Sequence, residues 1–232
     1  MNSKTYLEPE EIARMEEVAG NLRDRLLVRF LFRTGCRVSE VLGLTVEDIN
    51  LDGGNVTIRH LKSRFVLYCS SCNARLGAGH IFCPKCSGKV DERTAVEQQY
   101  RRQRNLPVDE GTMDMIGEFT KRGGPVSKQG KKLIFGINRH RAWQIVRDCA
   151  EKAGLSQLVN IETGRIHNVS PHRLRDAFAV HAMKTDDSGD GLRLLQEHLG
   201  HQSFNTTARC RKISGQELRD WYKVLWEGVD DD

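Results

Sequence analysis

Two closely spaced cysteine pairs, Cys69-x-x-Cys72 and Cys83-x-x-Cys86, constrain the fold of this chain more than any other feature. They lie between two strand-like segments, residues 55–59 and 104–108, the first of which follows an Asp-Gly-Gly turn. If the two strands pair as a hairpin, the segment between them is an insertion far longer than an ordinary hairpin loop. Such an insertion needs its own source of stability.

Zinc supplies that stability in our interpretation. Four thiolates presented by two tight turns can surround one metal ion as a tetrahedron, and this matches the softness and geometry of zinc. The sequence therefore predicts a structural zinc site formed by Cys69, Cys72, Cys83 and Cys86, in a zinc ribbon spanning residues 66–92. Two disulfides or a redox dithiol are the alternatives. The first residues lack a secretion signal, which disfavours disulfides.

The charge of the chain is concentrated around the same insertion. The 232 residues carry a formal net charge of +5. Between His60 and Pro107 there are nine Lys and Arg against three Asp and Glu, a balance of +6, so the remainder is 27 − 28 = −1. This concentration is typical of a surface that binds a polyanion, with a solvated basic loop as the alternative.

The remaining sequence predicts a mainly helical α+β protein. Hydrophobic residues at 38% and charged residues at 29% indicate one large globular domain or two small ones. Apolar residues at helical spacing predict helices at 9–19, 23–33, 38–44, 113–121, 139–153, 171–183, 191–199 and 214–226. Cys36 and Cys149 lie among apolar residues of these segments and are interpreted as core thiols. No apolar run is long enough to cross a membrane.

Four short motifs occur in a fixed order along this framework. The first is the turn Thr-Gly-Cys-Arg-Val-Ser-Glu that contains Arg37, and the second is Lys62, just after the first strand. The third is the His-x-x-Arg pair of His172 and Arg175, and the fourth is the Leu-Gly-His motif that ends at His201. A single His-x-x-Arg pair carries little information. The joint occurrence of all four motifs in this order is highly specific.

This set resembles the catalytic domain of the tyrosine recombinases, the phage integrase family that includes the Xer-type resolvases. The resemblance covers nearly the whole chain apart from the cysteine insertion. It implies an α+β recombinase fold with a small β-hairpin, into which the zinc ribbon is inserted. It also implies site-specific DNA recombination or integration, by strand cleavage and rejoining through a covalent 3′-phosphoprotein intermediate.

The same resemblance assigns the catalytic residues. Arg37 and Arg175 match the family's two arginines, Lys62 its hairpin lysine, and His172 and His201 its histidines. Two guanidinium groups can hold the non-bridging phosphate oxygens, on which charge builds up. Lysine can protonate the leaving 5′ oxygen, and histidine can carry a proton or hold the phosphate. This chemistry needs no metal, so the predicted zinc is structural. Basic residues expected to contact DNA are Arg64, Arg102, Arg104, Arg139 and Arg141.

The chain departs from the family at the nucleophile. The family has a tyrosine nine residues after the histidine of Leu-Gly-His, and this position is Cys210. Three explanations are open: an engineered change, a natural recombinase that has degenerated into a DNA-binding protein, or Cys210 acting as the nucleophile. The third is disfavoured, because soft sulfur is a poor match for phosphorus and the side chain is shorter than tyrosine. Tyr222 reads as a packing residue.

The resemblance also implies partners and context. Residues 1–232 are expected to be the catalytic domain without the N-terminal core-binding domain that family members usually carry. The partner is double-stranded DNA with specific recombination sites, and the helix at 214–226 would join protomers into a tetramer or else pack on its own domain. The expected location is the cytoplasm, at the nucleoid, with a prokaryotic, viral or mobile-element origin. The rival interpretation is a catalytically inactive, zinc-containing DNA-binding regulator.

Overall fold

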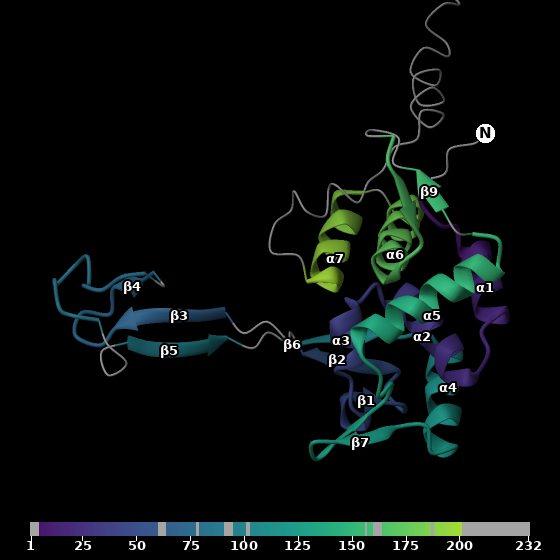
Figure 1. Cartoon of the computed structure of the whole chain (residues 1–232), viewed down its shortest axis with the longest axis horizontal. Helices are drawn as coiled ribbons and strands as arrows, with labels where there is room; N and C mark the ends of the chain where they lie inside the picture. The colour runs from purple at the N-terminus through teal and green to yellow at the C-terminus, as the bar shows by residue number, and fades with distance from the viewer. Residues whose placement is uncertain are drawn as a thin grey trace, which may run out of the picture.

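The computed structural model describes residues 5–59, 64–77, 79–90, 95–100, 103–155, 157–159, 164–186 and 188–200. In these ranges a helical body carries a small sheet, and a second small sheet projects from the body as an arm (Figure 1). This is the predicted mainly helical α+β architecture. Within the described part of the chain, no helix is long and apolar enough to cross a bilayer.

The helices lie close to where the apolar spacing predicts them. They are α1 (Pro9–Glu17), α2 (Leu22–Thr34), α3 (Val38–Leu42), α4 (Glu110–Lys121), α5 (Arg139–Lys152), α6 (Pro171–Thr185) and α7 (Gly189–Leu199), with a short 3-10 helix η1 (Val46–Asp48). Helix α4 begins before residue 113 because the Asp109 side chain caps it, accepting a hydrogen bond from the Thr112 amide at 3.1 Å. The predicted helix at 214–226 lies outside the described residues.

Helix α2 is the central helix of the body and packs against α1, α4 and α6. Its apolar side chains at helical spacing are buried, among them Leu26, Leu27, Phe30 and Leu31. The helix ends at Gly35, which adopts the left-handed conformation with φ +58°. This sharp end directs the following residues toward α6 and α7, where the candidate site lies.

The predicted hairpin is confirmed as part of a three-stranded antiparallel sheet. Strands β1 (Ile49–Asn50), β2 (Asn55–Arg59) and β6 (Gln103–Pro107) lie in the order β1-β2-β6. In the register of β2 with β6, Asn55 lies opposite Pro107 and Arg59 opposite Gln103. The proline therefore occupies a strand end, where its missing amide costs least. Val56, Ile58 and Leu106 bury the face of the sheet that contacts the helices.

The arm is a separate antiparallel sheet of β3 (Arg64–Cys69), β4 (Arg75–Leu76) and β5 (Ala95–Tyr100), in the order β4-β3-β5. In the register of β3 with β5, Arg64 lies opposite Tyr100 and Cys69 opposite Ala95. The paired strands thus extend beyond the predicted 66–92 limits on both sides. Figure 1 shows this sheet projecting from the edge of the body that carries β2 and β6.

Two further strand pairs were not predicted from the sequence. They are the hairpin of β7 (Val126–Lys128) with β8 (Lys131–Leu133), and the pair of β9 (Gln157–Val159) with β10 (Ile166–Asn168). All three residues of β7 are exposed. Such short, polar strands lack the alternating apolar pattern that would reveal them.

Candidate active site

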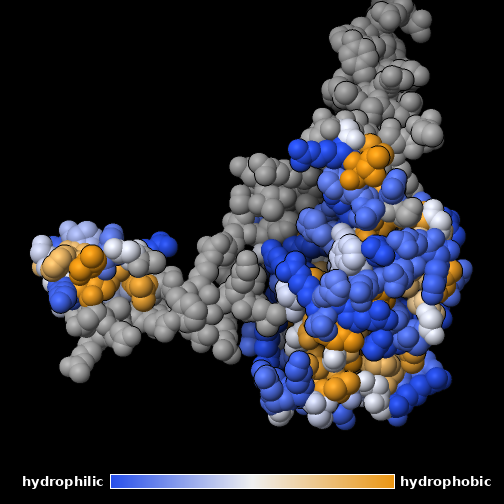
Figure 2. Space-filling view, viewed as in Figure 1, coloured by the Kyte–Doolittle hydropathy of each residue, from blue (hydrophilic) through white to orange (hydrophobic). Residues whose placement is uncertain are grey.

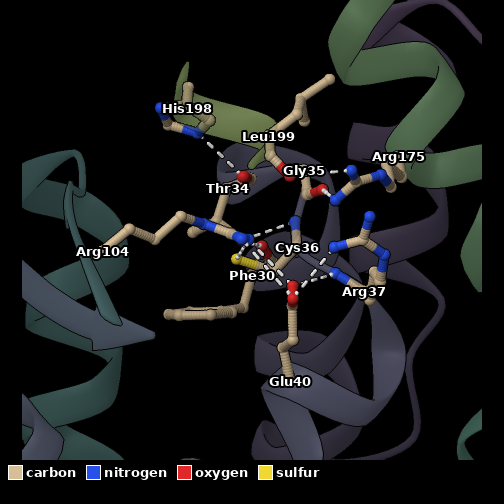
Figure 3. Close-up of polar contacts among 10 residues, drawn as sticks. All are labelled: Phe30, Thr34, Gly35, Cys36, Arg37, Glu40, Arg104, Arg175, His198 and Leu199. Atoms are coloured by element: carbon tan, nitrogen blue, oxygen red, sulfur yellow. Dashed lines mark hydrogen bonds and ion pairs between the residues drawn. The ribbon is translucent and has the colours of Figure 1, made fainter. Parts of the chain in front are cut away.

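Arg37 follows directly from the end of α2. A Cβ atom on Gly35 would lie 2.4 Å from Cδ1 of Phe178, so both the backbone conformation and the available space require glycine. Arg37 then takes the N-cap position of α3. Its backbone amide donates to Oε2 of Glu40 at 3.0 Å and its Nη1 donates to Oε1 at 3.1 Å (Figure 3). The Arg37 side chain is 38% exposed, so it is open to a ligand.

Glu40 is a buried carboxylate shared by two arginines. Its side chain is 1% exposed, and it accepts a hydrogen bond from Nη2 of Arg104 at 2.9 Å in addition to those from Arg37. Burial alone would raise the pKa of Glu40, but the charge of Arg104 and the hydrogen bonds from Arg37 and Arg104 hold it below its ordinary value. The carboxylate is therefore ionised and serves as an internal counterion.

Arg104 lies inside the protein and does not face solvent as the DNA-contact prediction requires. Its side chain, on β6, is only 14% exposed, and its Nη2 also lies 3.7 Å from Sγ of Cys36. Arg104 is held there because a buried carboxylate is costly without close cations, and Arg37, which is partly exposed, supplies only one of the two that contact Glu40. Cys36 itself is a buried thiol whose pKa burial raises, in agreement with its interpretation as a core residue.

Arg175 joins three parts of the chain. From α6, its Nη1 donates to the Gly35 carbonyl at 2.6 Å and its Nη2 donates to the Leu199 carbonyl at 3.0 Å. Burial and the neighbouring charge of Arg37 lower the pKa of Arg175 to about 10. Figure 3 shows the Arg175 and Arg37 guanidinium groups side by side. Helix packing therefore holds the buried guanidinium of Arg175 beside the more exposed guanidinium of Arg37.

His198 is a residue of this site that the sequence interpretation missed. Its Nε2 donates to the Thr34 carbonyl at 2.9 Å, and its ring stacks on Phe178 with centroids 4.9 Å apart. Burial lowers the pKa of His198, which favours the neutral ring. His198 lies three residues before the predicted His201 in the sequence, and this nearness to the Leu-Gly-His motif is the signal that could have identified it.

The structure brings together some of the predicted catalytic residues. Arg37 and Arg175 lie in one cluster. His172 lies in the first turn of α6 and is 75% exposed, with its Nε2 3.8 Å from Oδ1 of Asp176. Lys62, His201 and Cys210 lie outside the described residues.

The predicted DNA-contacting residues other than Arg104 fall into two groups. Arg139 and Arg141 are exposed in the first turn of α5. Arg64 begins β3, and Arg102 lies outside the described residues.

The described cluster has the charge of an anion-binding site. Arg37 and Arg104 bind the carboxylate of Glu40, and Arg175 lies beside Arg37; three guanidinium groups and one carboxylate leave a charge of 3 − 1 = +2. Arginine stays protonated even when buried and can bind two oxygens of a phosphate at once. The arrangement can hold a phosphodiester and stabilise the negative charge that develops on it during substitution at phosphorus.

The four cysteines form a second centre, in the arm. Sγ of Cys69 lies 3.6 Å from Sγ of Cys86, and Sγ of Cys72 lies 3.5 Å from Sγ of Cys83. All four sulfur atoms lie within 4.8 Å of one another. Zn–S bonds of about 2.3 Å place the sulfurs of a tetrahedral site about 3.8 Å apart. The observed separations fit one zinc ion.

Both cysteine turns have the same backbone geometry. In each, the first cysteine exchanges backbone hydrogen bonds of 2.8–2.9 Å with residues four and five positions later (Cys69 with Asn73 and Ala74, Cys83 with Ser87 and Gly88). Amide N–H groups in these turns point at the sulfurs. Those of Cys72 and Ser71 lower the pKa of Cys69 to about 6, and those of Cys86 and Lys85 lower that of Cys83. The Ala74 amide also acts to lower the pKa of Cys72, but burial and the neighbouring thiols outweigh it and raise that pKa to about 12. The turns therefore favour the thiolate at Cys69 and Cys83.

Comparison with known proteins identifies the family of the chain. The family model described as "Phage integrase family" matches residues 5–70 and 88–216, and so leaves out 71–87, which includes three of the four cysteines. "Tyrosine recombinase XerD" of Bifidobacterium longum is 30% identical over 207 residues, covering 87% of this chain and 53% of the relative. "Tyrosine recombinase XerA" of Pyrococcus furiosus is 26% identical over 221 residues, covering 92% and 59%. The chain thus spans little more than half the length of these curated relatives.

Solved structures show the same fold. The crystal structure of XerA recombinase matches with a TM-score of 0.64 at 21% identity, over 97% of this chain and 64% of that one. XerH recombinase bound to difH substrate, in a pre-cleavage complex, matches with a TM-score of 0.56 at 22% identity, over 97% and 55%. Tn1549 transposon integrase in complex with transposon right end DNA matches with a TM-score of 0.59 at 14% identity, over 97% and 67%.

Proposed function

Because the chain belongs to the phage integrase family, we propose that it acts in site-specific DNA recombination or integration, by cleaving and rejoining DNA strands. The observation that carries this proposal is the cluster of Arg37, Arg175 and buried Glu40, which supplies a preorganised, positively charged place for one phosphodiester. Relatives of known structure were solved with DNA substrates, which supports double-stranded DNA as the partner.

Each residue has a role in the proposed reaction. Arg37 and Arg175 bind the non-bridging oxygens of the scissile phosphate and stabilise its transition state. Lys62 protonates the leaving 5′ oxygen, while His172 and His201 move a proton or hold the phosphate. A tyrosine at position 210 would attack phosphorus and form the 3′-phosphoprotein intermediate as the 5′ oxygen leaves, and rejoining would reverse these steps.

The cysteine at position 210 decides whether this chain turns over. We propose that Cys210 disables the cleavage step, because sulfur attacks phosphorus poorly and the side chain is shorter than tyrosine. DNA binding is retained, since Arg37, Arg175 and the exposed arginines of α5 do not depend on it. The alternative function is therefore a catalytically inactive, zinc-containing DNA-binding regulator.

A covalent trapping experiment tests this proposal. The protein and its Cys210→Tyr variant are incubated with a nicked duplex carrying the recombination site, and the covalent protein–DNA adduct is measured on a denaturing gel. We expect an adduct only with tyrosine. Adding Arg37→Lys to the tyrosine variant should lower the cleavage rate by about 10²-fold or more. Arg25→Lys, at an exposed position of α2, is the matched control. An adduct with neither protein contradicts the enzymatic function.

Zinc belongs to the proposal as a structural cofactor. Cys69, Cys72, Cys83 and Cys86 would hold it, and the ion would link the two cysteine turns of the arm. Elemental analysis should find one zinc per chain. A value near zero after preparation under reducing conditions with zinc present contradicts this assignment.

We also propose assembly on DNA. The apolar helix predicted at 214–226 would dock on a neighbouring protomer to give a tetramer at the nucleoid, in the cytoplasm. Light scattering with and without duplex DNA tests the assembly, using the full chain and a chain that ends at residue 213. Equal masses for the two proteins on DNA would rule out this role of the helix.

A further inference from the structure

We propose that Arg104 is a positioning residue for phosphate binding: it shares the carboxylate of Glu40 and so leaves Arg37 able to bind the scissile phosphate. Arg104 touches neither the DNA nor the reacting atoms in this role and acts through Glu40. The role rests on the proposed function in DNA cleavage. It also replaces the direct DNA contact that the sequence predicts for Arg104.

The guanidinium of Arg104 is enclosed by the body of the protein. Figure 2 shows a body surface that is largely hydrophilic on this face, whereas the Arg104 side chain is only 14% exposed. Its Nη2 donates to Oε2 of Glu40 at 2.9 Å, and a Cβ atom on Gly200 would lie 2.5 Å from its Nη1. Gly200 ends α7 in the left-handed conformation, with φ +63°. The guanidinium therefore lies between α3 and the end of α7, in a space that glycine keeps open.

Stability gives little reason for an ion pair at this place. The Nε of Arg104 is buried, and it has no hydrogen-bond partner in the described part of the chain. A buried N–H group without a partner costs free energy. Replacing a whole buried ion pair by apolar side chains often costs no stability. The contact of Glu40 with Arg37 offers a functional reason for the pair instead.

The two arginines share the carboxylate unequally. Arg104 donates to Glu40 at 2.9 Å, while Arg37 donates from Nη1 to Oε1 at 3.1 Å. In Figure 3 the two guanidinium groups approach the carboxylate from different sides. Among the described residues, Nε and Nη2 of Arg37 make no hydrogen bond. These N–H groups are available to two oxygens of one phosphate.

Loss of Arg104 should change this division. Glu40 would then have fewer cations around it, and Arg37, which already contacts it, would be attracted more strongly. A carboxylate that pairs with both nitrogens of a guanidinium competes with phosphate for the same N–H groups. Phosphate binding at Arg37 should therefore weaken although no contact to the phosphate itself has been removed.

The first measurement is phosphate binding by the zinc-loaded full chain, which requires no cleavage. The NMR signal of the Arg37 Nε–H group, identified by its absence in Arg37→Lys, is followed during titration with inorganic phosphate. Arg104→Met should raise the Kd for phosphate about fivefold or more. Adding Glu40→Gln to it should restore the Kd to within about twofold, because the neutral amide does not compete for Arg37. Arg122→Met, which removes an exposed arginine, is the matched control.

The second measurement is the cleavage rate constant of the Cys210→Tyr protein on the nicked duplex, at saturating protein. Arg104→Met should lower it about tenfold, and Glu40→Gln should relieve this loss. A purely structural role would reduce the folded fraction and leave the phosphate Kd of the folded protein unchanged. If Arg104→Met does not fold, Glu40→Gln is compared with Glu40→Gln/Arg104→Met. These two should bind phosphate equally, because Arg104 acts through Glu40.

The outcomes separate the positioning role from the proposed function. If Cys210→Tyr cleaves DNA and Arg104→Met leaves the phosphate Kd or the rate constant unchanged, the positioning role is refuted and the proposed function stands. If Cys210→Tyr does not cleave, the proposed function fails and the phosphate Kd decides alone: an unchanged Kd refutes the role, and a raised Kd that Glu40→Gln restores supports it. A loss that Glu40→Gln does not relieve would show that Arg104 does not act through Glu40, and would overturn the proposal.

Discussion

The buried carboxylate of Glu40 leads to a quantitative prediction for Arg104→Met. Methionine keeps most of the length of the side chain and removes its charge. Glu40 would retain Arg37 but lose the hydrogen bonds from Arg104 at 2.9 and 3.5 Å. Removing one partner of a buried ion pair costs about 3–5 kcal/mol. Because Arg37 remains, we expect a loss of about 2–3 kcal/mol in the free energy of unfolding, or about 5–10 °C in Tm.

The loss should also depend on pH. The folded-state pKa of Glu40 lies below its ordinary value, so Glu40 stabilises the protein above the unfolded-state pKa of about 4.3, and this contribution disappears as pH falls. Without Arg104, burial prevails and the folded-state pKa of Glu40 rises. The difference in stability between the two proteins should therefore be largest near neutral pH and shrink as pH falls toward 4.

Urea denaturation of the zinc-loaded proteins measures these quantities. The control is Arg122→Met, which removes an exposed ion pair with Glu118 and should change stability by less than about 1 kcal/mol. Glu40→Gln alone and combined with Arg104→Met completes a double-mutant cycle. We expect the double variant to be more stable than the two single losses predict. Additive losses that do not change with pH would refute the counterion role of Glu40.

Three further predictions test other parts of the structure. Gly35→Ala should destabilise the protein by about 1–3 kcal/mol more than Gly123→Ala, because both glycines have positive φ but only Gly35 meets a neighbouring ring, and urea denaturation measures the difference. Burial lowers the pKa of His198, so the unfolded chain takes up a proton first and the unaltered protein should lose stability as pH falls below about 6.5. The His198→Gln variant should not show this loss. Equal pH dependence of the free energy of unfolding in the two proteins would contradict this. Cys86→Ser should abolish zinc binding and hydrogen-exchange protection in β3, while Cys149→Ser should leave both unchanged.

Local sequence patterns were sufficient to predict the main helices, the β2–β6 pairing and the cysteine cluster of this protein. The helices around Leu26 and Leu31, the pairing of Asn55 with Pro107, and the grouping of four cysteines all followed from spacing along the chain. These features depend on contacts between residues a few positions apart, or on a metal geometry that two short motifs specify almost completely. The strands of the arm and the β7–β8 hairpin carried no comparable signal.

The roles of Arg104 and His198 were decided by the tertiary structure alone. Arg104 looks like one more basic residue in a basic segment, and only the fold brings it to a carboxylate 64 residues away. His198 contacts a carbonyl 164 residues away. A buried charge or polar ring needs a hydrogen-bond or ion-pair partner. The packing of helices against the sheet decides which residue supplies that partner, and the neighbouring sequence does not. The sequence by itself thus determined which residues are available for phosphate and metal chemistry, and the packing determined which of them face the ligand and which hold the others in place.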